Sequence, residues 1–244
     1  METRVRNFAF FPLAGLLALG TAAPVPSMAQ AASFIISQNG KAVGAASFQF
    51  IAAPKGYDST SLVRVAMQGL DYALSKTEKL TSANQLRHVQ LSAVVNNSAV
   101  TVTAAPDSAQ FLVNISANGR STTTRLATHP ATVFLPDFDP GALETLLTLA
   151  VTHNNRDLWA IVPKQAGSIQ PITLATYPDG QGTLDGRQIT VHHLVATIAG
   201  SITDLFSGPE DQLLQAEMPR QGFALVRQGF VLKPPAKPEV PPAG

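Results

Sequence analysis

The chain has 244 residues, no cysteine, and 17 basic against 16 acidic side chains. The lack of cysteine excludes disulfides, thiol catalysis, iron–sulfur clusters and thiolate zinc sites. The near-zero net charge argues against a nucleic-acid partner, which needs a clustered basic surface to replace counterions.

Residues 1–31 have the pattern of a cleavable signal peptide. Arg4 and Arg6 form a short basic leader, an uncharged run covers residues 8–23, and Ala29-Gln30-Ala31 fits the small-x-small cleavage pattern. The alternative is an uncleaved anchor, but the run is shorter than the roughly 20 apolar residues that span a bilayer. Removing residues 1–31 leaves equal numbers of basic and acidic side chains. We expect a periplasmic or secreted protein with no transmembrane segment after cleavage.

Alternation of apolar and polar residues, typical of half-buried strands, dominates from Ser33 to Leu232. The apolar members include Phe48 and Phe50, Val63 and Val65, Val89 and Leu91, Val100 and Val102, Phe111 and Val113, and Ile189 and Val191. Asn39-Gly40 and Asn118-Gly119 are strong two-residue hairpin signals, and Asn96-Asn97 is a weaker one. Asp179-Gly180 and Asp185-Gly186 are expected to bracket a loop. About eleven or twelve strands at this regular spacing predict a sandwich or barrel.

One segment has helical periodicity instead. Asp139-Pro140 supplies a cap and a first-turn proline, and His153 closes the segment. The apolar stripe consists of Leu143, Leu146, Leu147, Ala150 and Val151. The predicted fold is therefore mainly β: one curved antiparallel sheet, a half-barrel or open barrel, with a single amphipathic helix against its concave face. The domains are a signal peptide (1–31), one β-rich domain (32–232) and a proline-rich disordered tail (233–244).

The histidines and carboxylates form no recognisable catalytic or metal-binding motif. His192 and His193 are neighbours on a strand, so their rings point to opposite faces and cannot chelate one metal. Asp137 and Asp139 are better explained by the positive end of the helix than as an acid–base pair. Trp159 stands in Leu158–Val162, a predicted buried strand, with ligand stacking as the alternative role. We expect no catalytic residue, no metal site and no cofactor.

Two short stretches support a resemblance. Asn39-Gly40-Lys41-Ala42-Val43-Gly44, leading to Phe48, is similar to the first hairpin of uncharacterised bacterial exported β-sheet domains, and Leu213–Pro219 is similar to their last hairpin. Such domains in turn resemble the half-barrel of the periplasmic lipoprotein carriers. The resemblance implies a sheet that cradles acyl chains under a helix.

Two functions follow as hypotheses. The first is a non-enzymatic binding or scaffold protein whose partner is an apolar, lipid-like ligand or another envelope protein. Its ligand-contacting residues would be Leu143, Leu146, Leu147, Trp159 and His193. The second is an exported hydrolase on a β-scaffold that uses a carboxylate or His193, and a pocket where a histidine meets Asp or Glu from another strand would favour it.

Overall fold

The computed structural model describes residues 31–165 and 167–234. Within them the chain forms sixteen strands, a 13-residue helix, α1 (Pro140–Thr152), and a short 3-10 turn, η1 (Pro163–Gln165). The strands in the first part of the chain are β1 (Ala31–Gln38), β2 (Lys41–Ala53), β3 (Gly56–Met67), β4 (Leu70–Leu80), β5 (Leu86–Val95), β6 (Ser98–Asp107), β7 (Gln110–Ala117) and β8 (Arg120–Ala127). Those in the second part are β9 (Ala131–Phe134), β10 (Leu158–Val162), β11 (Ser168–Leu184), β12 (Arg187–Ile198), β13 (Ser201–Ser207), β14 (Leu213–Met218), β15 (Phe223–Arg227) and β16 (Phe230–Leu232).

All sixteen strands belong to one large open sheet. Strands β1 to β8 follow one another as antiparallel hairpins, and strands β10 to β15 do the same. The two series are joined where β1 pairs with β15, in a register that places Phe34 opposite Arg227. Strand β9 pairs with β10 in parallel, which is the one departure from antiparallel pairing in the described sheet. The prediction of a mainly β fold with one open sheet and one helix is confirmed.

The hairpin turns predicted at Asn39-Gly40 and Asn118-Gly119 are present. Asn39 and Gly40 have φ values of 49° and 79°, the left-handed pair that a type I′ turn requires, and Asp185 and Gly186 repeat it. The prediction that Asp179-Gly180 begins a loop before β12 is wrong. That pair lies inside the 17-residue strand β11, at a register shift between Tyr177 and Gly180. A bulge absorbs the turn-forming residues there without ending the strand.

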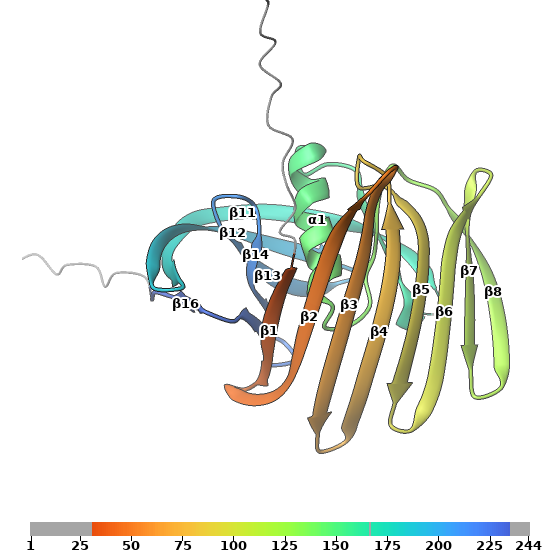
Figure 1. The fold of residues 1–244 in the computed structure, drawn as a ribbon, viewed down its shortest axis with the longest axis horizontal. Helices are drawn as coiled ribbons and strands as arrows, with labels where there is room; N and C mark the ends of the chain where they lie inside the picture. The colour runs from red at the N-terminus through yellow and green to blue at the C-terminus, as the bar shows by residue number, and fades with distance from the viewer. Residues whose placement is uncertain (1–30, 166, 235–244) are drawn as a thin grey trace, which may run out of the picture.

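The sheet bends so that its two strand series form two layers. Figure 1 shows β1–β8 as a curved wall, with β11–β13 passing behind it at a steep angle. Contacts of β5 with β9 and of β8 with β11 hold the layers together. The main core contains inward-facing residues of both layers, among them Phe34, Val65, Phe134, Leu205 and Leu225. A smaller cluster around Val191, Leu214 and Phe230 lies where β16 pairs with the far end of β11.

Helix α1 begins as predicted, with Asp139 as its N-cap. The carboxylate oxygen Oδ1 of Asp139 accepts hydrogen bonds from the backbone N–H groups of Gly141 (2.9 Å) and Ala142 (3.2 Å). The helix packs on β2, β3, β9 and β14, so Leu146 and Leu147 are fully buried. The expectation for Val151 is wrong, because its side chain is 50% exposed at the last turn.

The predicted signal peptide, apart from Ala31, and the proline-rich tail, apart from Lys233 and Pro234, lie outside the described residues. Among the described helices, none has the length and apolar character needed to cross a membrane.

Candidate functional site

The candidate site surrounds the segment 135–139, which connects β9 to α1. Two cavities flank this segment, with volumes of about 280 Å³ and 290 Å³. Both are lined by the same six residues: Leu70, Leu135, Pro136, Asp137, Phe138 and Lys164. The segment therefore forms a shared wall between two neighbouring spaces.

The first space, which we name the β4–β7 cavity, lies over the inner face of the curved wall. Its floor consists of inward-facing side chains from four successive strands, including Tyr72, Leu91, Val102 and Ile115. Neighbouring inward positions are small or β-branched, such as Ala93 and Val100, which pair across β5 and β6. Strand alternation directs every second side chain into this space, and the small ones leave it unfilled.

The second space, which we name the β13–β15 cavity, lies on the other side of the segment. Leu143 of α1, Met218 of β14, and Phe223 and Leu225 of β15 line it. Ser201, Thr203 and Gln221 add polar groups to its wall. An apolar lining with a few polar groups is the usual composition of a small-molecule site.

Phe138 stands between the two cavities. Its ring packs edge-on against Tyr72 of β4, with centroids 6.1 Å apart, and against Phe223 of β15, with centroids 4.8 Å apart. Its φ of 59° lies in the left-handed region, which is uncommon for a bulky residue. The two ring contacts compensate for this backbone conformation, and strain of this kind is often found at functional sites.

An exposed ion pair marks the rim that both cavities share. Lys164 Nζ lies 2.7 Å from Asp137 Oδ1, and the two side chains are 61% and 46% exposed. The Tyr72 hydroxyl donates a long hydrogen bond of 3.4 Å to the carbonyl oxygen of Asp137. Burial, and then the Asp137 and Asp139 carboxylates, raise the pKa of Tyr72, so the phenol stays neutral.

A buried charged cluster lies under the N-terminus of α1. Lys76 Nζ is 2.8 Å from Asp139 Oδ2 and 3.1 Å from Glu78 Oε2, and all three side chains are buried. The Lys76–Asp139 contact has ion-pair distance without hydrogen-bond alignment. Burial alone would lower the pKa of Lys76, but the carboxylates of Asp139 and Glu78 outweigh burial and raise it. Burial raises the pKa of the Glu78 carboxyl, against the attraction of Lys76.

This cluster also contains polar atoms that lack a protein partner. Within the described residues, the hydroxyls of Ser59 and Ser61 and the Oε1 of Glu78 are buried without a hydrogen bond. Ser61 faces the helix so closely that a Cβ on Gly141 would lie 2.5 Å from the serine oxygen. The same Cβ would lie 3.0 Å from the Cβ of Phe48, so the helix start is fitted tightly to β2 and β3.

Of the sequence-predicted ligand residues, Leu143 lines the β13–β15 cavity. Leu146 and Leu147 are buried under α1 and line neither of the two cavities. Trp159 stacks on His129, with ring centroids 3.8 Å apart and planes 10° apart. The assignment of these residues to a ligand stays a prediction.

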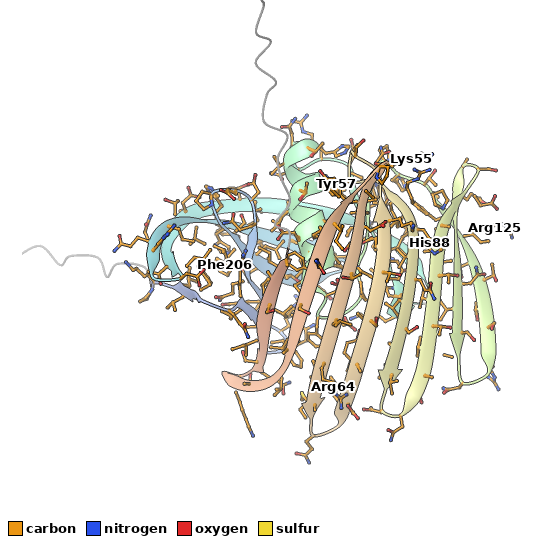
Figure 2. All side chains as sticks on the ribbon, in the orientation of Figure 1. Lys55, Tyr57, Arg64, His88, Arg125 and Phe206 are labelled. Carbon is orange, nitrogen blue, oxygen red and sulfur yellow. The ribbon has the colours of Figure 1, made fainter. Side chains whose placement is uncertain are left out.

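His193 meets an aspartate from another strand. Its Nε2 lies 2.8 Å from Asp204 Oδ1 of β13, and its ring stacks on Phe206 with centroids 4.6 Å apart. Phe206 lies in the layer of β11–β14, away from the curved wall (Figure 2). His192 pairs separately with Asp179 at 3.0 Å, as expected for neighbours on opposite faces of a strand. No group of three metal-ligating side chains occurs in the described part of the chain.

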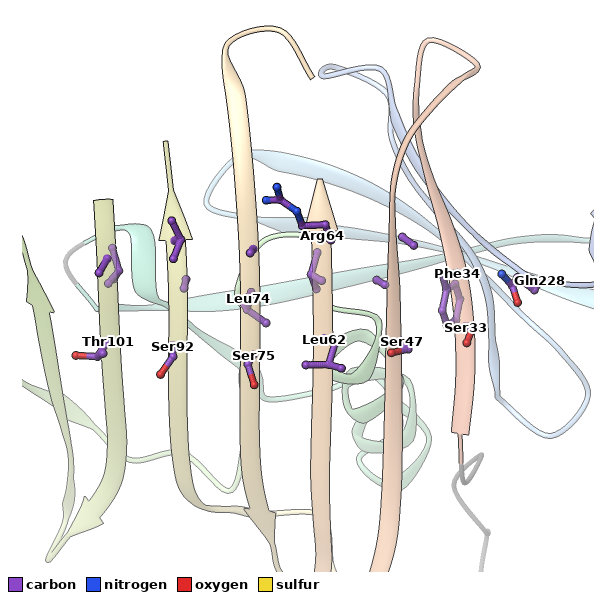
Figure 3. Close-up of a pocket in the computed structure, with 18 residues that line it drawn as sticks. Ser33, Phe34, Ser47, Leu62, Arg64, Leu74, Ser75, Ser92, Thr101 and Gln228 are labelled. Carbon is purple, nitrogen blue, oxygen red and sulfur yellow. The ribbon is translucent and has the colours of Figure 1, made fainter. Parts of the chain in front are cut away.

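A broader hollow of about 690 Å³ lies on the outer face of the curved wall. Figure 3 shows its central row, in which Thr101, Ser92, Ser75, Leu62, Ser47 and Ser33 succeed one another on neighbouring strands. Most of these side chains stand in solvent, and Leu62 is 58% exposed. This row is more open to solvent than the two inner cavities, so we place the candidate site between the two layers of the sheet.

Sequence reasoning missed Tyr72, Phe138 and Phe223 as site residues. They come from β4, a connecting segment and β15, and the pairing of β1 with β15 brings β15 to the first strand series. The one local signal was Phe138 between Asp137 and Asp139, an aromatic residue next to a helix cap. Comparisons with protein-family models, curated proteins and solved structures find no match to this chain.

Proposed function

We propose that this chain is an exported, non-enzymatic binding protein that holds an apolar, lipid-like ligand between the two layers of its sheet. The observation that supports this most is the pair of mainly apolar cavities that share the wall 135–139. Burying an alkyl surface there gains about 25 cal/mol per Å². The Lys164–Asp137 pair at the rim gives a polar head group contact with both signs of charge.

The test is binding of the neutral fluorescent probe N-phenylnaphthylamine to the purified mature protein. Val100 faces the β4–β7 cavity and Ala99, its neighbour on β6, is exposed on the other face. We expect Val100→Phe to weaken probe binding at least tenfold, because the added ring fills the cavity, and Ala99→Phe to leave it unchanged. Thermal unfolding of both variants checks that they fold. A wild-type protein that does not bind the probe contradicts the proposal, as does equal binding by both variants.

The second candidate is a hydrolase that uses His193 with Asp204. The 2.8 Å contact between strands β12 and β13 favours it, because an aspartate orients a histidine for proton transfer. Replacing His193 by Gln distinguishes the two roles. If a hydrolytic activity is found and this variant loses turnover with unchanged melting behaviour, the enzyme hypothesis is supported. If stability falls at least as clearly as turnover per folded molecule, His193 is structural.

A further inference from the structure

The two inner cavities are separated by the segment 135–139, and the side chain of Phe138 lies at the boundary between them. They share six lining residues, and the ring of Phe138 spans from Tyr72 on the β4–β7 side to Phe223 on the β13–β15 side. Each cavity alone, at 280–290 Å³, lies just under the volume of about 300–1,000 Å³ that is usual for ligand pockets. The two cavities together would have a volume within the range that is usual for ligand pockets.

We propose that the two cavities are halves of one site for a single unbranched alkyl chain, and that Phe138 limits the chain length it accepts. This inference rests on the proposed function and adds the ligand class and a specificity-determining residue. The alkyl chain would enter at the rim, where both cavities meet Lys164 and Asp137, and extend into one cavity up to the Phe138 ring. The head group stays at the exposed Lys164–Asp137 ion pair. Because solvent screens this pair, separating its two side chains costs little free energy.

Two observations support a slim chain over a bulky ligand. The first is the small volume of each cavity on its side of the wall. The second is the lining of the β4–β7 cavity, where the groups are alkyl and aromatic apart from the Tyr72 hydroxyl, Asp137 and Lys164. A ligand with several polar groups would leave them unpaired against such walls, which is costly.

The backbone at Phe138 offers a direct test. Glycine adopts a φ of 59° without steric cost, so Phe138→Gly relieves the strained backbone while it removes the ring that lies between the two cavities. Asp157 has a similar φ of 55°, is exposed, and does not line either cavity, so Asp157→Gly is the matched control. Phe138→Leu is a second variant that keeps an apolar side chain but shortens it.

The measurement is displacement of N-phenylnaphthylamine by straight-chain carboxylates from hexanoate to myristate. For wild-type protein and Asp157→Gly, affinity should rise about fourfold with each methylene that becomes buried, and then stop rising at an intermediate length. For Phe138→Gly it should keep rising to longer chains, and Phe138→Leu should stop rising between the two. Circular dichroism melting shows which variants fold. If Phe138→Gly does not fold, the chain-length profile of Phe138→Leu decides the test.

The outcomes separate this inference from the proposed function. If the probe binds and the chain-length profile of the folded Phe138 variants equals that of wild type, Phe138 does not limit chain length. The proposed apolar binding site is then still supported. If the affinity of the wild-type protein rises continuously from hexanoate to myristate, the proposal that Phe138 limits chain length is also wrong. If wild type does not bind the probe, both proposals fail.

Discussion

Asp139 serves two partners with its two carboxylate oxygens. One oxygen caps α1 by accepting from the N–H groups of Gly141 and Ala142, and the other lies beside the buried ammonium of Lys76. A capping residue is worth about 1 kcal/mol, whereas breaking a buried ion pair costs about 3–5 kcal/mol. The second role therefore dominates the energetics of this residue.

The first prediction concerns Asp139. Replacement by Ala removes both roles, so the free energy of unfolding should fall by about 3–5 kcal/mol. Replacement by Asn also removes the charge beside Lys76 but keeps an oxygen for the cap, so the loss should be smaller by about 1 kcal/mol. Urea unfolding measures both. Equal losses in the two variants would mean that capping contributes nothing here.

The second prediction concerns Glu78 and pH. Burial raises the pKa of this carboxyl in the folded protein above its ordinary value of 4.5. The folded state then holds a proton that the unfolded chain releases, so this contribution to stability is complete below pH 4.5 and is lost as pH rises toward the raised pKa. Glu78→Gln cannot titrate. The stability of wild type relative to Glu78→Gln, followed by urea unfolding, should decrease as the pH rises above 4.5. A constant or increasing difference would show that Glu78 stays ionised.

At the scale of elements, α1 is held at more than one point. Its first turn is fixed by the cluster of Lys76, Glu78 and Asp139, and the Glu144 carboxylate accepts a 2.7 Å hydrogen bond from the backbone N–H of Leu213 on β14. Its residues from Pro140 to Leu147 are all buried. These contacts favour a fixed helix over a movable lid.

The third prediction tests that choice. Leu147 is 1% exposed, so Leu147→Ala should lower the free energy of unfolding by about 2–5 kcal/mol. Val151→Ala is the control at the exposed end of the helix, and it should cost well under 1 kcal/mol. Amides of residues 142–152 should exchange hydrogen as slowly as those of the neighbouring strands, with or without an alkyl carboxylate. Exchange well ahead of the strands, slowed by the ligand, would identify a lid instead.

The sequence predicted elements whose determinants are local. The cap of α1 follows from Asp139-Pro140, and the hairpins at Asn39-Gly40 and Asn118-Gly119 follow from turn chemistry. Periodicity also placed Phe48 and Val63 on the buried face. It did not explain Lys76 and Glu78, which occupy inward positions of β4 between Leu74 and Leu80. Two charges on an apolar face were the available signal of a buried cluster.

The candidate site was beyond such reasoning because it depends on the whole molecule. Strand β15, near the end of the described chain, pairs with β1 at its start, and this joins two series of hairpins into one bent sheet. Phe223 reaches Phe138 only through that pairing. Pairing between distant segments leaves no periodic trace in a single sequence, so the two cavities could not be inferred from it.

The position of β1 also bears on the proposed export. Phe34 and Ile36 are fully buried where β1 joins β2 to β15, so removing them by a later cleavage would expose the junction of the two layers. Cleavage after Ala31 removes only the first residue of β1 and leaves Ala32 paired with Phe48. The sheet thus tolerates the site that the small-x-small pattern indicates.

The fourth prediction is that the mature protein begins at or near Ala32. Mass spectrometry of protein from its native host should find this terminus, because signal peptidase requires small residues at Ala29 and Ala31. Ala31→Leu should cause the uncleaved precursor to accumulate, while Gln30→Leu, at the position that the peptidase does not read, should be processed normally. Ala31 is exposed on β1, so Ala31→Leu should leave the melting temperature of the uncleaved precursor unchanged. Full-length wild-type chain retained in the membrane fraction would show an uncleaved anchor, and the periplasmic or secreted location would then have to be given up.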